Sequence, residues 1–85
     1  MTDTVTFAVQ ALPEPGLLPR LLQPFAKRDL VPDRMLAERQ GEEMRVTFTL
    51  DAPDPGCIHL IAGNLGQVVG VLDVSVQHAR WAEAA

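Results

Sequence analysis

The feature that most constrains this chain is a strict alternation of apolar and polar residues near its middle. Met44, Val46, Phe48 and Leu50 alternate with Arg45, Thr47, Thr49 and Asp51. A period of two places every second side chain on one face, so this pattern predicts a β-strand with one buried face. Residues 4–12 alternate in the same way, with Val5, Phe7, Val9 and Ala11 on the apolar face. We therefore expect a sheet that covers a core.

A helical spacing follows the first strand. After the break at residues 13–16, Leu18, Leu21, Leu22 and Phe25 follow the i, i+3, i+4, i+7 spacing of an amphipathic helix. Pro19 suits the first turn, where its missing N–H costs little. Pro24 lies in the interior and removes a hydrogen bond, so we expect a kink or early fraying near Gln23.

A second helix is expected after residues 51–56. Asp54 is placed to cap it, and Pro55 suits its first position. Ile58, Ile61 and Leu65 give its apolar face, and Gly66 is the expected C-cap.

Two weaker strands complete the order. Residues 30–39 predict an edge strand with Met35 and Ala37 facing inward, followed by a hairpin turn at residues 40–43. Residues 69–77 predict the last strand, with Leu72, Val74 and Val76 facing inward. The order β-α-β-β-α-β predicts an α+β, ferredoxin-like sandwich: a four-stranded antiparallel sheet with two helices on one face. Residues 1–78 form the single domain and residues 79–85 a C-terminal tail, in which Trp81 either folds back or docks on a partner.

Composition excludes several classes of function. The net charge of −4 argues against a nucleic-acid partner and an anionic membrane surface, which both select clustered Lys and Arg. A single cysteine, Cys57, excludes an internal disulfide and fits a reducing, cytoplasmic location. The N-terminus lacks the basic and apolar regions of a secretory signal. Cys57 and His59 lie two residues apart on a helix and cannot share a metal ion. No local motif supports a catalytic group, so no cofactor and no enzymatic activity are expected.

Residues 12–28 and 65–74 resemble a known family. Gly16, Leu18, Arg20, Phe25 and Arg28 fall in register with the loop and first helix of ACT domains, and residues 65–74 resemble the end of that domain. The likeness is strongest to the small regulatory subunit of acetolactate synthase. It implies a regulatory role and an amino-acid effector whose carboxylate meets the backbone N–H groups of Gly16, Leu17 and Leu18. The residues alone also allow Gly16 simply to make a turn.

Two departures from that subfamily concern the effector. Those subunits carry Asn three residues before the loop glycine, where this chain has Pro13, and a second Asn in a stretch that reads Asp-Leu-Val-Pro at residues 29–32. Glu14 also places a negative charge where a carboxylate is expected. The resemblance thus implies that fold and assembly can persist without effector binding.

The resulting hypothesis is a non-catalytic regulatory subunit that binds and modulates an amino-acid biosynthetic enzyme, the thiamine-diphosphate-dependent catalytic subunit of acetolactate synthase. The alternative is a free-standing homodimeric amino-acid sensor acting on other partners. A small enzyme of unrelated chemistry is a third interpretation.

Self-association is expected at the second strand. This topology leaves the second and fourth strands at the sheet edges, and a small domain gains core by pairing an edge with a copy of itself. We predict a homodimer through Arg34, Leu36 and Glu38 with the adjoining flank of the first helix. Pro32 would confine the pairing to the residues after it. Charged edge residues can also block such pairing.

Overall fold

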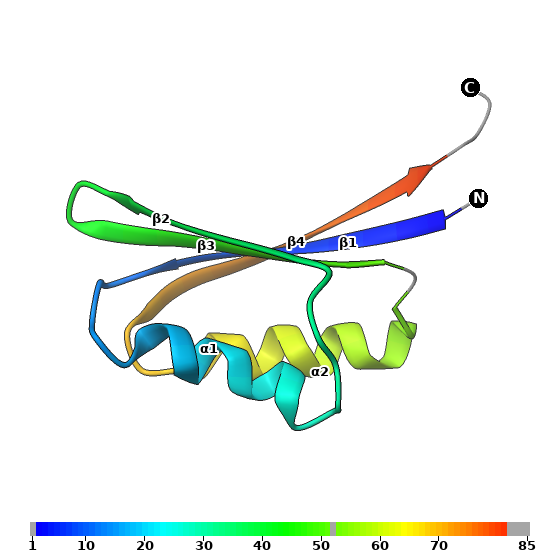
Figure 1. Cartoon of the computed structure of the whole chain (residues 1–85), viewed down its shortest axis with the longest axis horizontal. Coiled ribbons are helices and arrows are strands. Elements are labelled where there is room, and N and C mark those ends of the chain that lie inside the picture. Colours follow the sequence, from blue (N-terminus) through cyan, green and yellow to red (C-terminus); the bar gives the residue numbers. More distant parts are fainter. Residues whose placement is uncertain (1, 52, 82–85) are drawn as a thin grey trace.

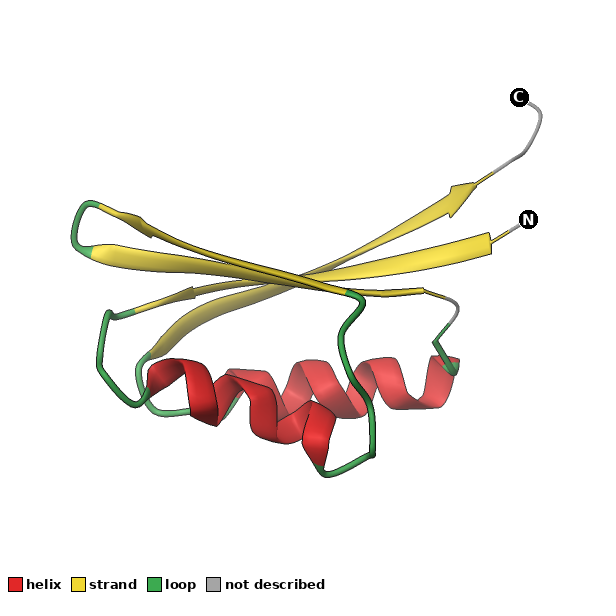
Figure 2. Cartoon of the chain, viewed as in Figure 1, coloured by secondary structure: helices red, strands yellow, loops and turns green. Residues whose placement is uncertain are grey.

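The chain folds into one sheet covered on one face by two helices. The computed structural model describes residues 2–51 and 53–81. The elements in chain order are β1 (Thr2–Ala11), α1 (Leu17–Ala26), β2 (Arg34–Gln40), β3 (Glu43–Asp51), α2 (Pro55–Gly66) and β4 (Val71–Trp81). The sheet order is β2-β3-β1-β4, antiparallel throughout, and both helices lie on the same side of it (Figures 1 and 2). The predicted ferredoxin-like fold is confirmed, with β2 and β4 at the edges.

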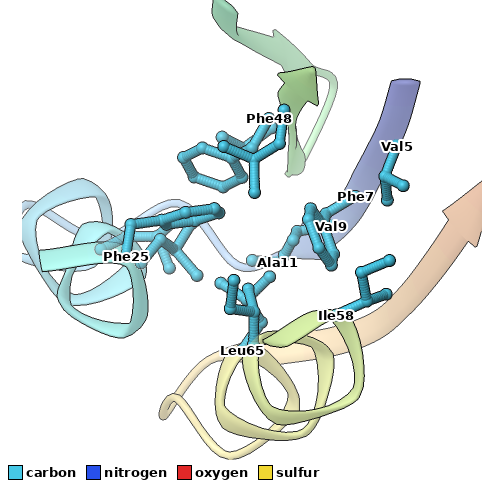
Figure 3. Packing of buried hydrophobic residues seen from close by; sticks show 13 residues of the cluster. Val5, Phe7, Val9, Ala11, Phe25, Phe48, Ile58 and Leu65 are labelled. Atoms are coloured by element: carbon cyan, nitrogen blue, oxygen red, sulfur yellow. The ribbon is translucent and has the colours of Figure 1, made fainter. Parts of the chain in front are cut away.

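The alternation in the two central strands determines which face is buried. Phe7 on β1 lies opposite Phe48 on β3 and Val76 on β4, and all three point toward the helices. Phe25 of α1 completes the aromatic centre, with its ring centroid 4.8 Å from that of Phe48 and 5.9 Å from that of Phe7. Figure 3 shows this packing, with Ile58 and Leu65 of α2 closing the other side. The two layers are therefore joined by apolar contacts from both helices.

Helix α1 continues through Pro24, contrary to the expected fraying. It ends at Ala26, and the Lys27 N–H still donates to the Gln23 carbonyl (2.9 Å). Pro24 is buried, and its carbonyl accepts from the Arg28 guanidinium (3.0 Å). Burial against the rest of the fold thus offsets the missing N–H.

Helix α2 begins as predicted and ends differently. The Asp54 carboxylate accepts from the Gly56 N–H (3.4 Å), and Pro55 is the first helical residue. The prediction of Gly66 as the C-cap is wrong. Gly66 is the last helical residue, and Gln67 caps the helix in a right-handed conformation. Two further i→i−3 hydrogen bonds, from Gln67 and Val68, tighten the end, and the positive φ (99°) comes later, at Gly70.

Strand β4 differs from its prediction at both ends. It begins at Val71, and residues 79–81, expected in a tail, pair with β1. The register shifts between Gln10 and Ala11, which lie opposite Asp73 and Val71, so Leu72 is an extra residue in the ladder. Leu72 is 53% exposed, and its predicted inward orientation is wrong. The Trp81 side chain, for which two roles were open, and residues 82–85 lie outside the described part.

Candidate functional site

The loop between β1 and α1 was expected to present free N–H groups at Gly16, Leu17 and Leu18. Gly16 caps α1 without a side-chain hydrogen bond, and its carbonyl accepts from the Arg20 N–H (3.4 Å). The Leu17 N–H already donates to the Glu14 carbonyl (3.0 Å), closing a turn. The Leu17 side chain is buried in the core. Leu17 therefore anchors the loop, and its N–H is not free for a ligand.

The Arg20 side chain lies over the loop backbone. One of its nitrogens, Nη1, is 3.3 Å from the Glu14 carboxylate and 3.5 Å from the Val69 carbonyl oxygen. A Cβ at Gly16 would lie only 2.9 Å from the other terminal nitrogen, Nη2. Glycine thus allows the guanidinium to approach the loop. Both side chains of the ion pair are about two-fifths exposed, so the pair adds at most about 1 kcal/mol and exchanges readily with water or a ligand.

A hollow of about 390 Å³ adjoins this loop on the side of the β2–β3 hairpin. Its walls are Pro13, Glu14, Pro15, Leu17, Leu18, Arg39 and Met44. The lining is mostly apolar and carries one carboxylate, Glu14, and one guanidinium, Arg39. This combination can hold the ammonium and the carboxylate of an amino acid while apolar walls contact its side chain.

Two of the three loop residues predicted from the sequence line this hollow, and the residues on its hairpin side were not predicted. Gly16 lies beside the hollow, Leu17 and Leu18 line it, and Arg39 and Met44 come from strands that are distant in sequence. Arg39 carries no local signal, because a single arginine near a turn is typical of a solvated surface. The β2–β3 hairpin places Arg39 opposite Met44, and the pairing of β3 with β1, in which Met44 lies opposite Ala11, brings both beside the loop.

The predicted dimer edge lies on β2, with its outer side unpaired in the single chain. Arg34, Leu36 and Glu38 share the sheet face that points away from the helices, because Met35 and Ala37 lie opposite the buried Phe48 and Val46. Leu36 is 53% exposed. The edge is therefore accessible for pairing, which stays a prediction.

The described residues also bear on metal binding and on membrane crossing. Cys57 is a free, half-buried thiol, and no group of three or more His, Cys, Asp or Glu residues in ranges 2–51 and 53–81 is arranged to hold a metal ion. Neither α1 nor α2 is long and apolar enough to cross a bilayer.

The fold and the loop together define an ACT-like domain. A family model described as "ACT-like domain" matches residues 2–83, and the chain therefore belongs to this family. ACT domains as a class are regulatory, non-catalytic modules that commonly bind amino acids and dimerise. No curated protein matches the chain in sequence.

Solved structures show the same fold at low identity. The ACT domain from the GTP pyrophosphokinase of Chlorobium tepidum matches with a TM-score of 0.75 and 10% identity, covering 91% of this chain and 100% of that one. The C-terminal domain of the MgtC protein from Mycobacterium tuberculosis matches with a TM-score of 0.73 and 16% identity, covering 98% of this chain and 94% of that one. The ligand-free regulatory subunit of aspartate kinase from Thermus thermophilus matches with a TM-score of 0.66 and 16% identity, covering 91% of this chain and 53% of that one. At these identities the likeness establishes the fold, and the finer likeness to the acetolactate synthase subunit stays a prediction.

Proposed function

We propose that this chain is a non-catalytic regulatory module that binds an enzyme of amino-acid biosynthesis and changes its activity. The observation that carries the proposal is the ACT-like match over residues 2–83, which includes all six elements of the fold. One structural neighbour is named as the regulatory subunit of aspartate kinase, which illustrates the role that such a domain can take in another protein.

The proposed partner is the thiamine-diphosphate-dependent catalytic subunit of acetolactate synthase, as the resemblance in residues 12–28 and 65–74 implies. The test is co-purification of the tagged chain with the untagged catalytic subunit, followed by an assay of acetolactate formation. We expect the two to co-elute and the activity to change. If neither occurs, this partner is excluded.

The second candidate is an amino-acid sensor, favoured by the hollow beside Gly16. Glu14 and Arg39 offer opposite charges at an apolar wall formed by Leu17 and Leu18. We expect calorimetry with a panel of amino acids to detect binding of one that has an apolar side chain. Arg39→Gln is expected to weaken this binding about tenfold, as for the loss of one charge-assisted hydrogen bond. If no amino acid gives a heat of binding, the sensor function is excluded and only the role as a regulatory subunit remains.

Dimerisation through β2 is compatible with both proposed functions, the regulatory subunit and the amino-acid sensor. In an antiparallel self-pairing, Arg34 and Glu38 would each lie near the opposite charge of the second copy. The test is light scattering on the wild type and on Ala37→Pro, which removes a backbone donor from the outer side of β2. The two-residue turn pairs Gln40 with Glu43, so the Leu36 N–H is directed toward β3 and not toward a second copy. A wild-type monomer at micromolar concentration would contradict the prediction.

A further inference from the structure

Charge is unevenly distributed between the helix layer and the rest of the molecule. Residues 16–28 and 55–70, which contain both helices, carry Arg20, Lys27 and Arg28 and no Asp or Glu. All 11 acidic residues lie elsewhere in the sequence. A chain with a net charge of −4 therefore presents a helix layer that is positive. An acidic partner is repelled by most of the surface and attracted to this layer.

The two helices of this layer lie side by side (Figure 1), and a groove lies between them. We call it the helix groove: a hollow of about 250 Å³ with Arg20, Pro24 and Lys27 on the α1 side and Asn64, Gln67 and Val68 on the α2 side. Pro24 is buried, and Val68 and Asn64 are half-buried, so these three form the floor. Arg20, Lys27 and Gln67 are exposed and form the rim.

The cations along the groove differ in their partners. The Arg28 guanidinium, just beyond the floor, donates to the Pro24 carbonyl (3.0 Å) and to the Asn64 amide oxygen (3.2 Å) when that amide is turned toward it. Arg20 forms the exposed pair with Glu14. The Lys27 ammonium has no hydrogen bond or ion pair within residues 2–51 and 53–81. Lys27 is therefore the free positive charge of the groove, and Arg20 is the one that exchanges most easily.

The spacing of these two cations selects the kind of anion. Arg20 and Lys27 are seven residues apart, which is about two helical turns and roughly 10 Å along the axis of α1. Two carboxylates seven residues apart on another helix have the same separation and lie on one face. Between them, an apolar side chain at i+3 or i+4 would lie over Pro24 and Val68.

A small ligand fits the groove less well than a helix does. Small-molecule sites enclose most of the ligand surface, roughly 70–90%. Here the rim residues are exposed and the floor is shallow, so a small anion would stay largely in solvent. A partner helix brings its own bulk to cover the rim and uses the groove for one apolar and two acidic side chains.

We propose that the helix groove docks an acidic amphipathic helix of a partner protein, with carboxylates at i and i+7 paired with Lys27 and Arg20. The proposal goes beyond the regulatory function above, because it names the surface and the chemistry of the partner. It does not depend on the partner being acetolactate synthase.

The test is a nuclear magnetic resonance titration of the full ¹⁵N-labelled chain with a defined probe. The probe is a side-chain-stapled helical peptide, capped at both ends, with two glutamates seven positions apart and a leucine midway between them. The control peptide has glutamine at both positions. We expect amide shifts confined to residues 20–28 and 64–68, with binding that weakens as salt is added.

Variants of the chain make the assignment specific. Lys27→Gln is expected to weaken peptide binding about threefold to fivefold, as for the loss of an exposed charge pair. Lys27→Glu is expected to weaken it by roughly tenfold or more. Arg45→Gln removes the same charge from the sheet face that points away from the helices and is expected to leave the affinity unchanged. Lys27 is exposed, so the variants are expected to fold, which circular dichroism checks.

Three results would each overturn the proposal: no shifts in the helix groove, equal binding of the glutamine peptide, or an unchanged affinity in Lys27→Glu. The titration contains no enzyme. A failure of co-purification with acetolactate synthase would therefore count against the proposed function and not against the helix groove, and the converse also holds.

Discussion

The two helices begin in different ways, although both cover the same face of the sheet. Helix α2 begins with local signals: Asp54 caps its N-terminus and Pro55 is its first residue. Helix α1 begins at Leu17, after a Gly16 that has no side-chain cap, and the Arg20 side chain reaches back over the entry loop to Glu14 and across to Val69. One helix start is determined within a few residues. The other also contacts a segment that is distant in sequence, through the Val69 carbonyl, and it lies beside the hollow of about 390 Å³.

Contacts in the core should contribute more to the free energy of unfolding than the helix ends do, and Phe25→Ala tests this expectation. Phe25 is buried and contacts the rings of both Phe7 and Phe48, so we expect a loss of about 3–5 kcal/mol in the free energy of unfolding. Urea denaturation measures it. Leu60→Ala on α2, where Leu60 is 56% exposed, is the control and should cost less than about 1 kcal/mol. Equal effects would contradict the packing described.

Gly70→Ala should have the next largest effect, because it strains the segment that the α1 loop rests on. Gly70 has φ of 99°, and its carbonyl accepts from the Leu12 N–H (2.8 Å). We expect a loss of about 1–3 kcal/mol, measured by thermal unfolding. Gly63→Ala is the matched control: Gly63 lies inside α2 with open space around its Cα, so alanine should stabilise the chain by about 0.5–1 kcal/mol. A neutral Gly70→Ala would refute the strain argument.

Asp54→Ala should remove the local signal at the start of α2. The loss of the carboxylate that accepts from Gly56 is expected to cost about 1 kcal/mol. Asp54→Asn keeps an oxygen acceptor and should lose only a few tenths of a kcal/mol. Chemical denaturation of the two variants decides the matter, and an equal loss in both would show that the charge, not the cap, is important.

Gly16→Ala should have the smallest effect, although it lies in the candidate site. The three atoms nearest to the new Cβ all belong to the end of the flexible Arg20 side chain, which can swing into solvent. We expect a change of no more than about 0.5 kcal/mol, with the Arg20–Glu14 pair broken. In an Arg20→Gln background the same substitution should have still less effect. A loss above about 2 kcal/mol would show that the loop backbone itself cannot accommodate a side chain.

The sequence was sufficient for the elements and their order, because each rests on a short-range pattern. The alternation in β1 and β3, the apolar spacing of α1 and α2, and the cap at Asp54 are all properties of neighbouring residues, and right-handed crossovers leave one arrangement for that order. The family resemblance also followed from residues close together in the chain, and the ACT-like match confirms it at the level of the family.

Only the tertiary structure decided the details that depend on pairing between distant segments. Leu72 faces outward because the β1–β4 register shifts at Gln10 and Ala11, and α1 passes through Pro24 because the fold buries that residue. Arg39 joins the loop hollow because β3, its hairpin partner, pairs with β1, and Lys27 and Val68 line one groove only because the two helices pack together. The physical reason is the same in each case: a local pattern determines what a segment becomes, whereas its neighbours are selected by the free energy of burying the whole core at once.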